Sequence, residues 1–122
     1  MPEYYRVVCE NIGITEAVKR DCERGNPARL EKPDGSWLPR LGNRYPGAIS
    51  LWTKDGMDKY YQSGLLEWQA SVVKGQVYVV VIDRPGKVLY RDDYQIICDP
   101  LSILPKKKIL LGDFILELIA SF

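Results

Sequence analysis

The stretch that decides the fold is Gln76-Val-Tyr-Val-Val-Val-Ile-Asp83, written QVYVVVID. Its β-branched residues favour extended backbone. An unbroken apolar run of this length is typical of a strand that is covered on both faces. Arg84-Pro-Gly86 follows with the residues of a tight turn. The stretch therefore predicts an interior strand with the remaining sheet built around it.

Two segments that precede this strand predict strand-to-helix units. Residues 4–9 (YYRVVC) indicate a first strand, and Thr15 suits the N-cap of a helix over 15–24. Residues 47–52 indicate a second strand, which runs into a helix over 54–62. The spacing of apolar side chains thus changes twice before residue 63 from the period of two that is typical of a strand to the period of a helix.

The second half of the chain reads mainly as strands. Residues 65–74 (LLEWQASVVK) alternate apolar and polar side chains, which favours a strand. Residues 87–90 and 94–98 indicate two more short strands. We therefore expect an α+β fold with a largely antiparallel sheet and two helices in the N-terminal half. Residues 1–100 would form a single domain.

The last residues, 101–122, differ in composition from the rest. Residues 109–122 carry more apolar side chains than one face of a helix needs, so this apolar C-terminal segment should pack on the core or on a partner subunit. It is too short to cross a membrane comfortably. Lys106, Lys107 and Lys108 before it read as a solvated connector.

Composition excludes several classes of function. The chain has 122 residues, 17 basic and 16 acidic side chains and a net charge of +1, so nothing predicts bulk attraction to nucleic acid or a membrane. It contains no histidine, which removes Ser-His and Cys-His nucleophile pairs and histidine metal sites. Any catalysis must use carboxylates, hydroxyls, amides, Lys, Arg or Tyr.

The cysteines and the N-terminus point to a cytoplasmic protein. Cys9, Cys22 and Cys98 are far apart, and none has a second cysteine at metal-binding spacing. We expect buried reduced thiols and no metal site. The first residues, MPEYYRVV, contain neither a secretory signal nor a membrane span.

A small set of polar residues is spread over three predicted strands. Arg6 lies in the first, Ser50 and Thr53 lie around the end of the second, and Asp93 and Gln95 lie at the start of the last. A guanidinium suits a phosphate, and hydroxyl, amide and carboxylate groups suit a ribose. This pattern resembles the R-S-E class of the ADP-ribosyltransferase superfamily, which has an Arg on its first strand, a Ser-x-Thr-type motif on a strand that enters a helix, and a Glu on a later strand.

The resemblance implies a cleft that binds NAD. Arg6 would contact phosphate or ribose, Ser50 would support the nicotinamide end, Thr53 would border the same cleft, and Tyr60 or Tyr61 would stack on the nicotinamide ring. Gln95 stands where the family has its catalytic Glu, so either Asp93 serves instead or the domain binds without transferring ADP-ribose. All of these side chains would have to border one cleft.

Other interpretations stay open. Thr53 suits a helix N-cap whatever the function, and Arg6 can simply point outward from a strand. Residues 26–46 form a long proline-containing loop of a kind often used for binding. The alternative function is therefore a protein-interaction module that uses this loop or the apolar tail, with a homo-oligomer formed through residues 109–122.

Overall fold

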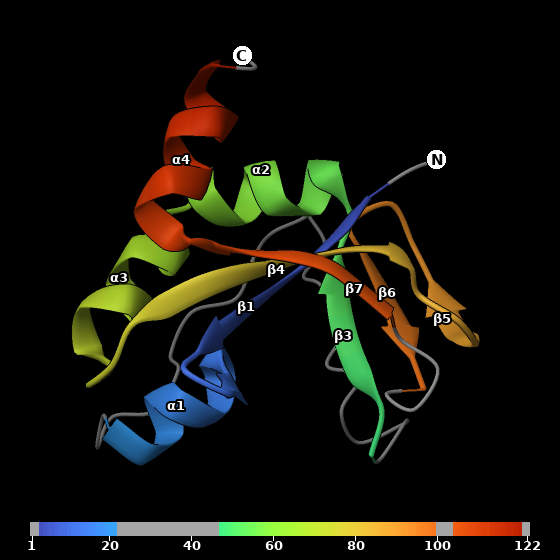
Figure 1. Cartoon of the computed structure of the whole chain (residues 1–122), viewed down its shortest axis with the longest axis horizontal. Coiled ribbons are helices and arrows are strands. Elements are labelled where there is room, and N and C mark those ends of the chain that lie inside the picture. Colours follow the sequence, from blue (N-terminus) through green and yellow to red (C-terminus); the bar gives the residue numbers. More distant parts are fainter. Residues whose placement is uncertain (1–2, 22–46, 100–103, 121–122) are drawn as a thin grey trace.

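The structure is a computed structural model that describes residues 3–21, 47–99 and 104–120 (Figure 1). The expected 26–46 loop and Cys22 lie outside the described residues. The elements in chain order are β1 (Tyr4–Cys9), β2 (Ile12–Gly13), α1 (Ile14–Asp21), β3 (Ile49–Trp52), α2 (Lys54–Gln62), α3 (Leu65–Val72), β4 (Val77–Arg84), β5 (Val88–Arg91), β6 (Gln95–Cys98), β7 (Leu104–Leu110) and α4 (Leu111–Ala120).

The strands form one antiparallel sheet in the order β5-β6-β3-β1-β4-β7, and β2 pairs with the end of β1. The fold class is therefore α+β with a largely antiparallel sheet, as expected. β4 lies between β1 and β7, which confirms the predicted interior strand, but it is fully covered on the helix-packed face only, because Tyr78 and Val80 on its other face are half-buried. β1 meets β3 only through the pair Tyr5–Trp52, so the two halves of the sheet are joined weakly at this point.

The two faces of the sheet carry two separate apolar clusters. On one face, Val7 and Val79 pack with side chains of the four helices, such as Leu66 of α3 and Phe114 of α4; we call this the helix face. On the other, the far face, Leu51 and Ile96 belong to a smaller cluster with Tyr4, Ile82 and Cys98. In Figure 1, α2, α3 and α4 lie together at the upper left, and β5 and β6 lie at the right.

The prediction of a strand over residues 65–74 is wrong, because Leu65–Val72 form helix α3. The buried positions are Leu65, Leu66 and Gln69, with Val73 just after the helix, and their spacing is helical. Gln69 is only 1% exposed although it is polar, so the apolar pattern alone missed one member of the buried face. Three helices, α1, α2 and α3, therefore precede β4, where the sequence predicted two.

The prediction that the three lysines before the apolar tail form a connector is also wrong. The three lysines lie within strand β7, which pairs with β4 at the edge of the sheet, and are not a connector. Helix α4 then returns to the helix face, where Phe114 and Leu118 are buried. The apolar segment thus packs on the core with one side. Leu116 and Ile119, on its other side, are 69% and 50% exposed.

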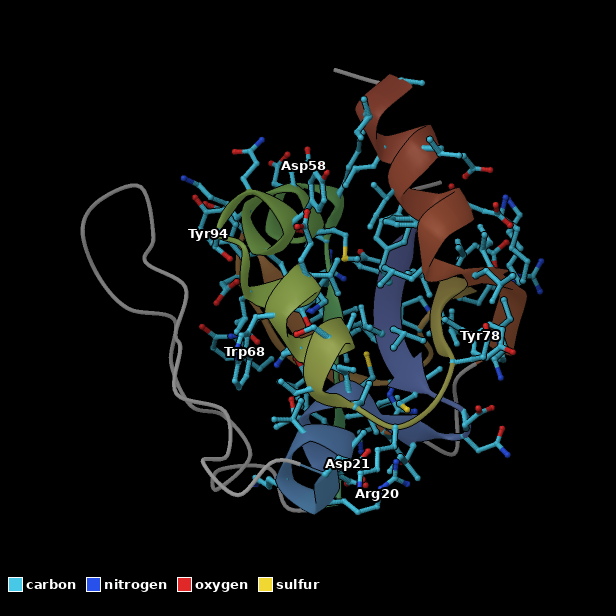
Figure 2. The ribbon with its side chains drawn as sticks, turned by 90° about the vertical axis from the view of Figure 1, so that its left-hand side faces the viewer. Arg20, Asp21, Asp58, Trp68, Tyr78 and Tyr94 are labelled. Carbon is cyan, nitrogen blue, oxygen red and sulfur yellow. The ribbon has the colours of Figure 1, made fainter. Side chains whose placement is uncertain are left out.

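The end of α1 is tied to the start of β4 through one carboxylate. Asp21 accepts a hydrogen bond from Nε of Arg20 at 2.8 Å and another from the backbone N–H of Lys74 at 2.8 Å. Figure 2 shows Arg20 and Asp21 side by side at this end of the molecule. The bond from Arg20 is the main reason why the pKa of Asp21 lies below its usual value.

Two further expectations concern the thiols and the membrane. Cys9 and Cys98 are buried and free, which agrees with the prediction of reduced thiols for these two residues. No helix among residues 3–21, 47–99 and 104–120 has the length and apolar character that crossing a bilayer requires.

Candidate functional site

The joint between β3 and α2 is built around Thr53. Its Oγ1 accepts a hydrogen bond from the backbone N–H of Gly56 at 3.0 Å, so Thr53 is the helix N-cap that the sequence predicts. The same hydroxyl donates to the carbonyl oxygen of Asp93 at 2.7 Å. One side chain therefore begins α2 and holds it against the segment that leads into β6.

Ser50 and Gln95 meet on the helix face, next to this joint. Trp52 pairs with Tyr5 and belongs to the core of the helix face, and Ser50 lies two residues before it on the same side of β3. The Ser50 hydroxyl donates to Oε1 of Gln95 at 3.1 Å. Two residues 45 positions apart in the chain are thus brought together.

Gln95 combines deep burial with an unused donor. Its side chain belongs to a residue that is 7% exposed, and its Nε2 has no hydrogen-bond partner. Rotating the amide would leave Oε1 without a partner instead, because Ser50 contacts only one end of it. Ser50 itself is exposed, so the pair has one end at the surface and one end inside.

The turn before β6 fixes the position of Gln95. Oδ1 of Asp92 accepts hydrogen bonds from the backbone N–H groups of Tyr94 at 2.8 Å and of Gln95 at 2.9 Å. This is an Asx-type turn, so Asp92 has a structural role. Asp93 is exposed and contributes its backbone carbonyl to Thr53.

The two candidate stacking tyrosines differ in their surroundings. Tyr60 is 2% exposed and is stacked on Trp52, with ring centroids 4.9 Å apart and an angle of 21° between the planes. Its hydroxyl donates to Oε1 of Gln69, and burial raises its pKa well above the usual value. The Tyr60 ring is therefore buried in the core and offers no free face for stacking on a ligand, whereas Tyr61 is half-buried at the margin of the core.

Arg6 is separated from the other predicted site residues. It lies between Tyr5 and Val7, whose side chains pack on the helix face, so its own side chain belongs to the far face. Its ladder partner Val80 packs against the far-face cluster. Arg6 therefore does not share a face of the sheet with Ser50 and Gln95, and the expectation of one common cleft is wrong. The error arises because alternate residues of a strand point to opposite faces.

Two features escaped the sequence interpretation. Oδ1 of Asp58 in α2 is buried without a partner, and burial raises the pKa of this carboxyl, with Lys54 opposing the shift and Asp55 adding to it. Nothing in the polar sequence of α2 distinguishes Asp58 from its neighbours. The second feature is a hollow of about 280 Å³ on the far face that contains Arg6 and Lys108. The sequence did not indicate this hollow, because Lys108 was assigned to a connector and not to a strand of the sheet.

The described residues contain no group of three or more Cys, Asp or Glu side chains arranged to hold a metal ion. Comparison of the chain with protein-family models, with curated proteins and with solved structures gave no match. The candidate site is therefore defined by its own geometry: Ser50 and Gln95 on the helix face, braced by Thr53 and the turn around Asp93.

Proposed function

We propose that the protein binds an NAD-class nucleotide at the Ser50–Gln95 pair. The observation that carries the proposal is the hydrogen bond from Ser50 to Gln95, which leaves Nε2 of Gln95 buried without a partner. An unsatisfied buried amide costs free energy, about 1–3 kcal/mol, and a ligand oxygen would recover part of that cost. A ribose hydroxyl can supply such an oxygen and can donate in return.

The pair also fits binding better than transfer. The resemblance to ADP-ribosyltransferases assigns a catalytic carboxylate to the position that Gln95 occupies, and an amide carries no negative charge to support an oxocarbenium-like centre. Asp93 uses its backbone for Thr53, and its side chain is exposed. We therefore propose a nucleotide-binding domain of ADP-ribosyltransferase-like type without transferase activity, in which Arg6 takes no part.

Thermal unfolding with and without NAD, ADP-ribose and nicotinamide tests this proposal. A ligand that binds only the folded state raises the unfolding midpoint, and the rise grows with the logarithm of the ligand concentration once this exceeds Kd. We expect a rise with NAD that is lost in Ser50→Ala and in Gln95→Met, and that is retained in Arg6→Gln. Arg6→Gln is the matched control because it changes a predicted site residue on the other face of the sheet.

Two results would contradict it. An unfolding midpoint that does not change in millimolar NAD would show that the protein does not bind NAD. A shift that is retained in Gln95→Met would show that NAD binds at another site. Nicotinamide release measures transfer separately. The wild-type chain should release none, and Gln95→Glu restores the carboxylate, so activity in that variant would identify Gln95 as the replaced catalytic position.

The exposed side of α4 favours a second candidate, a self-associating interaction module. Leu116 and Ile119 are three residues apart and therefore neighbours on the helix surface, and both are largely exposed. A second copy of the chain would cover them through the same side of its own α4. Light scattering after gel filtration tests this: Leu116→Gln with Ile119→Gln should convert a dimer to a monomer, and a wild-type monomer at about 100 μM would exclude an association of useful strength.

A further inference from the structure

The hollow on the far face is a second candidate site, distinct from Ser50 and Gln95. Its volume is about 280 Å³, and its base is apolar: Val8 is 4% and Ile82 is 1% exposed. Arg6, Glu10 and Lys108 also line it. The volume is near the lower limit for ligand pockets, about 300 Å³, so a small molecule or one part of a larger one would fill it.

The two cations of the hollow lie in one row across three strands. Arg6 pairs with Val80 in the β1–β4 ladder, and Val80 pairs with Lys108 in the β4–β7 ladder. Residues directly opposite each other in a ladder share a face of the sheet, and neighbouring strands are about 4.8 Å apart. The backbone positions of Arg6 and Lys108 are therefore about 10 Å apart on the far face, with the small side chain of Val80 between them.

None of the hydrogen bonds or ion pairs among the described residues involves the Arg6 guanidinium, and the one charge that acts on it there is that of Glu16. The side chain is half-buried, and this burial lowers the pKa of Arg6, with the charge of Glu16 opposing the shift. A guanidinium has five N–H donors in a planar fork that matches the oxygens of a phosphate or carboxylate. An anion in the hollow would satisfy these donors.

Lys108 is held in place but is not neutralised by an ion pair. Its Nζ lies 4.3 Å from the centroid of the Tyr78 ring and donates to the carbonyl oxygen of Glu10 at 3.2 Å. The Glu10 carboxylate accepts the backbone N–H of Gln76 at 3.0 Å. Tyr78 lies on the side of the molecule away from Trp68 and Tyr94, as Figure 2 shows.

The nearby Lys106 shows the contrast. Its Nζ lies 3.2 Å from Oε2 of Glu3, so its charge is paired. No described carboxylate lies within ion-pair distance of Lys108 or Arg6. The hollow therefore combines an apolar base with two cations, neither of which lies within ion-pair distance of a described carboxylate, and with Glu10, whose carboxylate accepts the backbone N–H of Gln76.

From this arrangement we infer that the hollow binds a phosphate monoester of a small organic molecule. A phosphate monoester has three acceptor oxygens on phosphorus, so it can contact the Arg6 fork and Lys108 at once, whereas a carboxylate has only two oxygens. The apolar base around Val8 and Ile82 suits an organic group on the ester oxygen. Inorganic phosphate alone would leave that surface uncovered.

Calorimetric titration with AMP tests the inference, with adenosine and inorganic phosphate as the comparison ligands. AMP should bind, phosphate should bind more weakly, and adenosine should show no measurable binding. Arg6→Gln should weaken AMP binding about tenfold or more, and Lys108→Gln should weaken it severalfold. Retained circular dichroism would show that each variant folds.

Lys107→Gln is the matched control because it makes the same change of net charge on the same strand. Lys107 pairs with Val81, which belongs to the helix face, so it points away from the hollow. AMP affinity should be unchanged in Lys107→Gln. The inference does not rest on the proposed function, since Arg6→Gln should weaken AMP binding and leave the thermal shift with NAD unchanged.

Three results would overturn the inference. No binding at about 5 mM AMP would exclude a site of useful affinity. Equal losses in Lys107→Gln and Lys108→Gln would show that bulk charge, and not the hollow, attracts the nucleotide. Equal affinities for AMP and inorganic phosphate would exclude the organic group from the site.

Discussion

The hydroxyl of Ser50 donates to Oε1 of Gln95 at 3.1 Å, and the other end of that amide, Nε2, is buried with no partner. The pair joins β3 to β6 on the helix face. The amide of Gln95 is thus only partly hydrogen-bonded, although the residue is only 7% exposed. The environment of Gln95 therefore opposes an added negative charge, which makes the charge state of a substituted residue informative.

The first prediction concerns Gln95→Glu and pH. Burial should raise the pKa of the new carboxyl in the folded state above its unfolded value of about 4.3, although the Ser50 donor reduces the shift. Stability should therefore match the wild type below about pH 4 and fall as pH rises through the folded pKa, by about 1–3 kcal/mol at pH 7. Urea unfolding at pH 4 and pH 7 measures the difference, and Gln95→Met should show no such dependence.

The second prediction concerns the two hydrogen bonds of the Thr53 hydroxyl. Thr53→Ala removes both the cap of α2 and the bond to the Asp93 carbonyl. We expect a loss of about 1–3 kcal/mol in the free energy of unfolding. Thr53→Ser keeps the hydroxyl and should lose less than about 0.5 kcal/mol, whereas Thr53→Val keeps the shape and should resemble Thr53→Ala. Equal stability of the Ser and Val variants would show that packing, and not hydrogen bonding, matters here.

The third prediction concerns Tyr60, which is buried and donates to Gln69. Tyr60→Phe leaves the Gln69 amide oxygen without this donor and should cost about 1–3 kcal/mol. Because burial raises the pKa of Tyr60 in the folded state, the unfolded phenol ionises first, and wild-type stability should fall as pH rises above about 10. That decline should be smaller in Tyr60→Phe. The control, Tyr61→Phe at a half-buried position, should change stability by less than about 0.5 kcal/mol.

Local signals predicted much of the fold because they depend on neighbours in the chain. The strand at residues 4–9 and the helix at 54–62 have the bounds that their patterns indicated. α3 was missed because its buried face includes Gln69, whose partner Tyr60 lies on another helix. β7 was missed because its three lysines satisfy no apolar pattern, and its pairing with β4 is long-range.

The candidate site shows the same division. The contact between Ser50 and Gln95 joins two of the predicted site residues, and the N-cap at Thr53 is the one that its local sequence predicts. The face of Arg6 depends on the register of β1 against β4, and one residue of shift would move it to the other face. Sequence order alone cannot provide that register, so the predicted cleft combined residues from two faces.

The last prediction compares two glycines in helices. A Cβ built on Gly56 would lie 1.9 Å from the carbonyl oxygen of Tyr94, whereas one on Gly112 would meet nothing within 4 Å. Backbone cannot yield as a flexible side chain does, so Gly56→Ala should separate the first turn of α2 from the turn before β6 and cost about 3 kcal/mol or more. Gly112→Ala should instead stabilise α4 by about 0.4–1 kcal/mol, because alanine loses less backbone entropy. Chemical denaturation of both variants measures the two signs, and a destabilised Gly112→Ala would show that α4 carries a constraint on Gly112 that steric space does not explain.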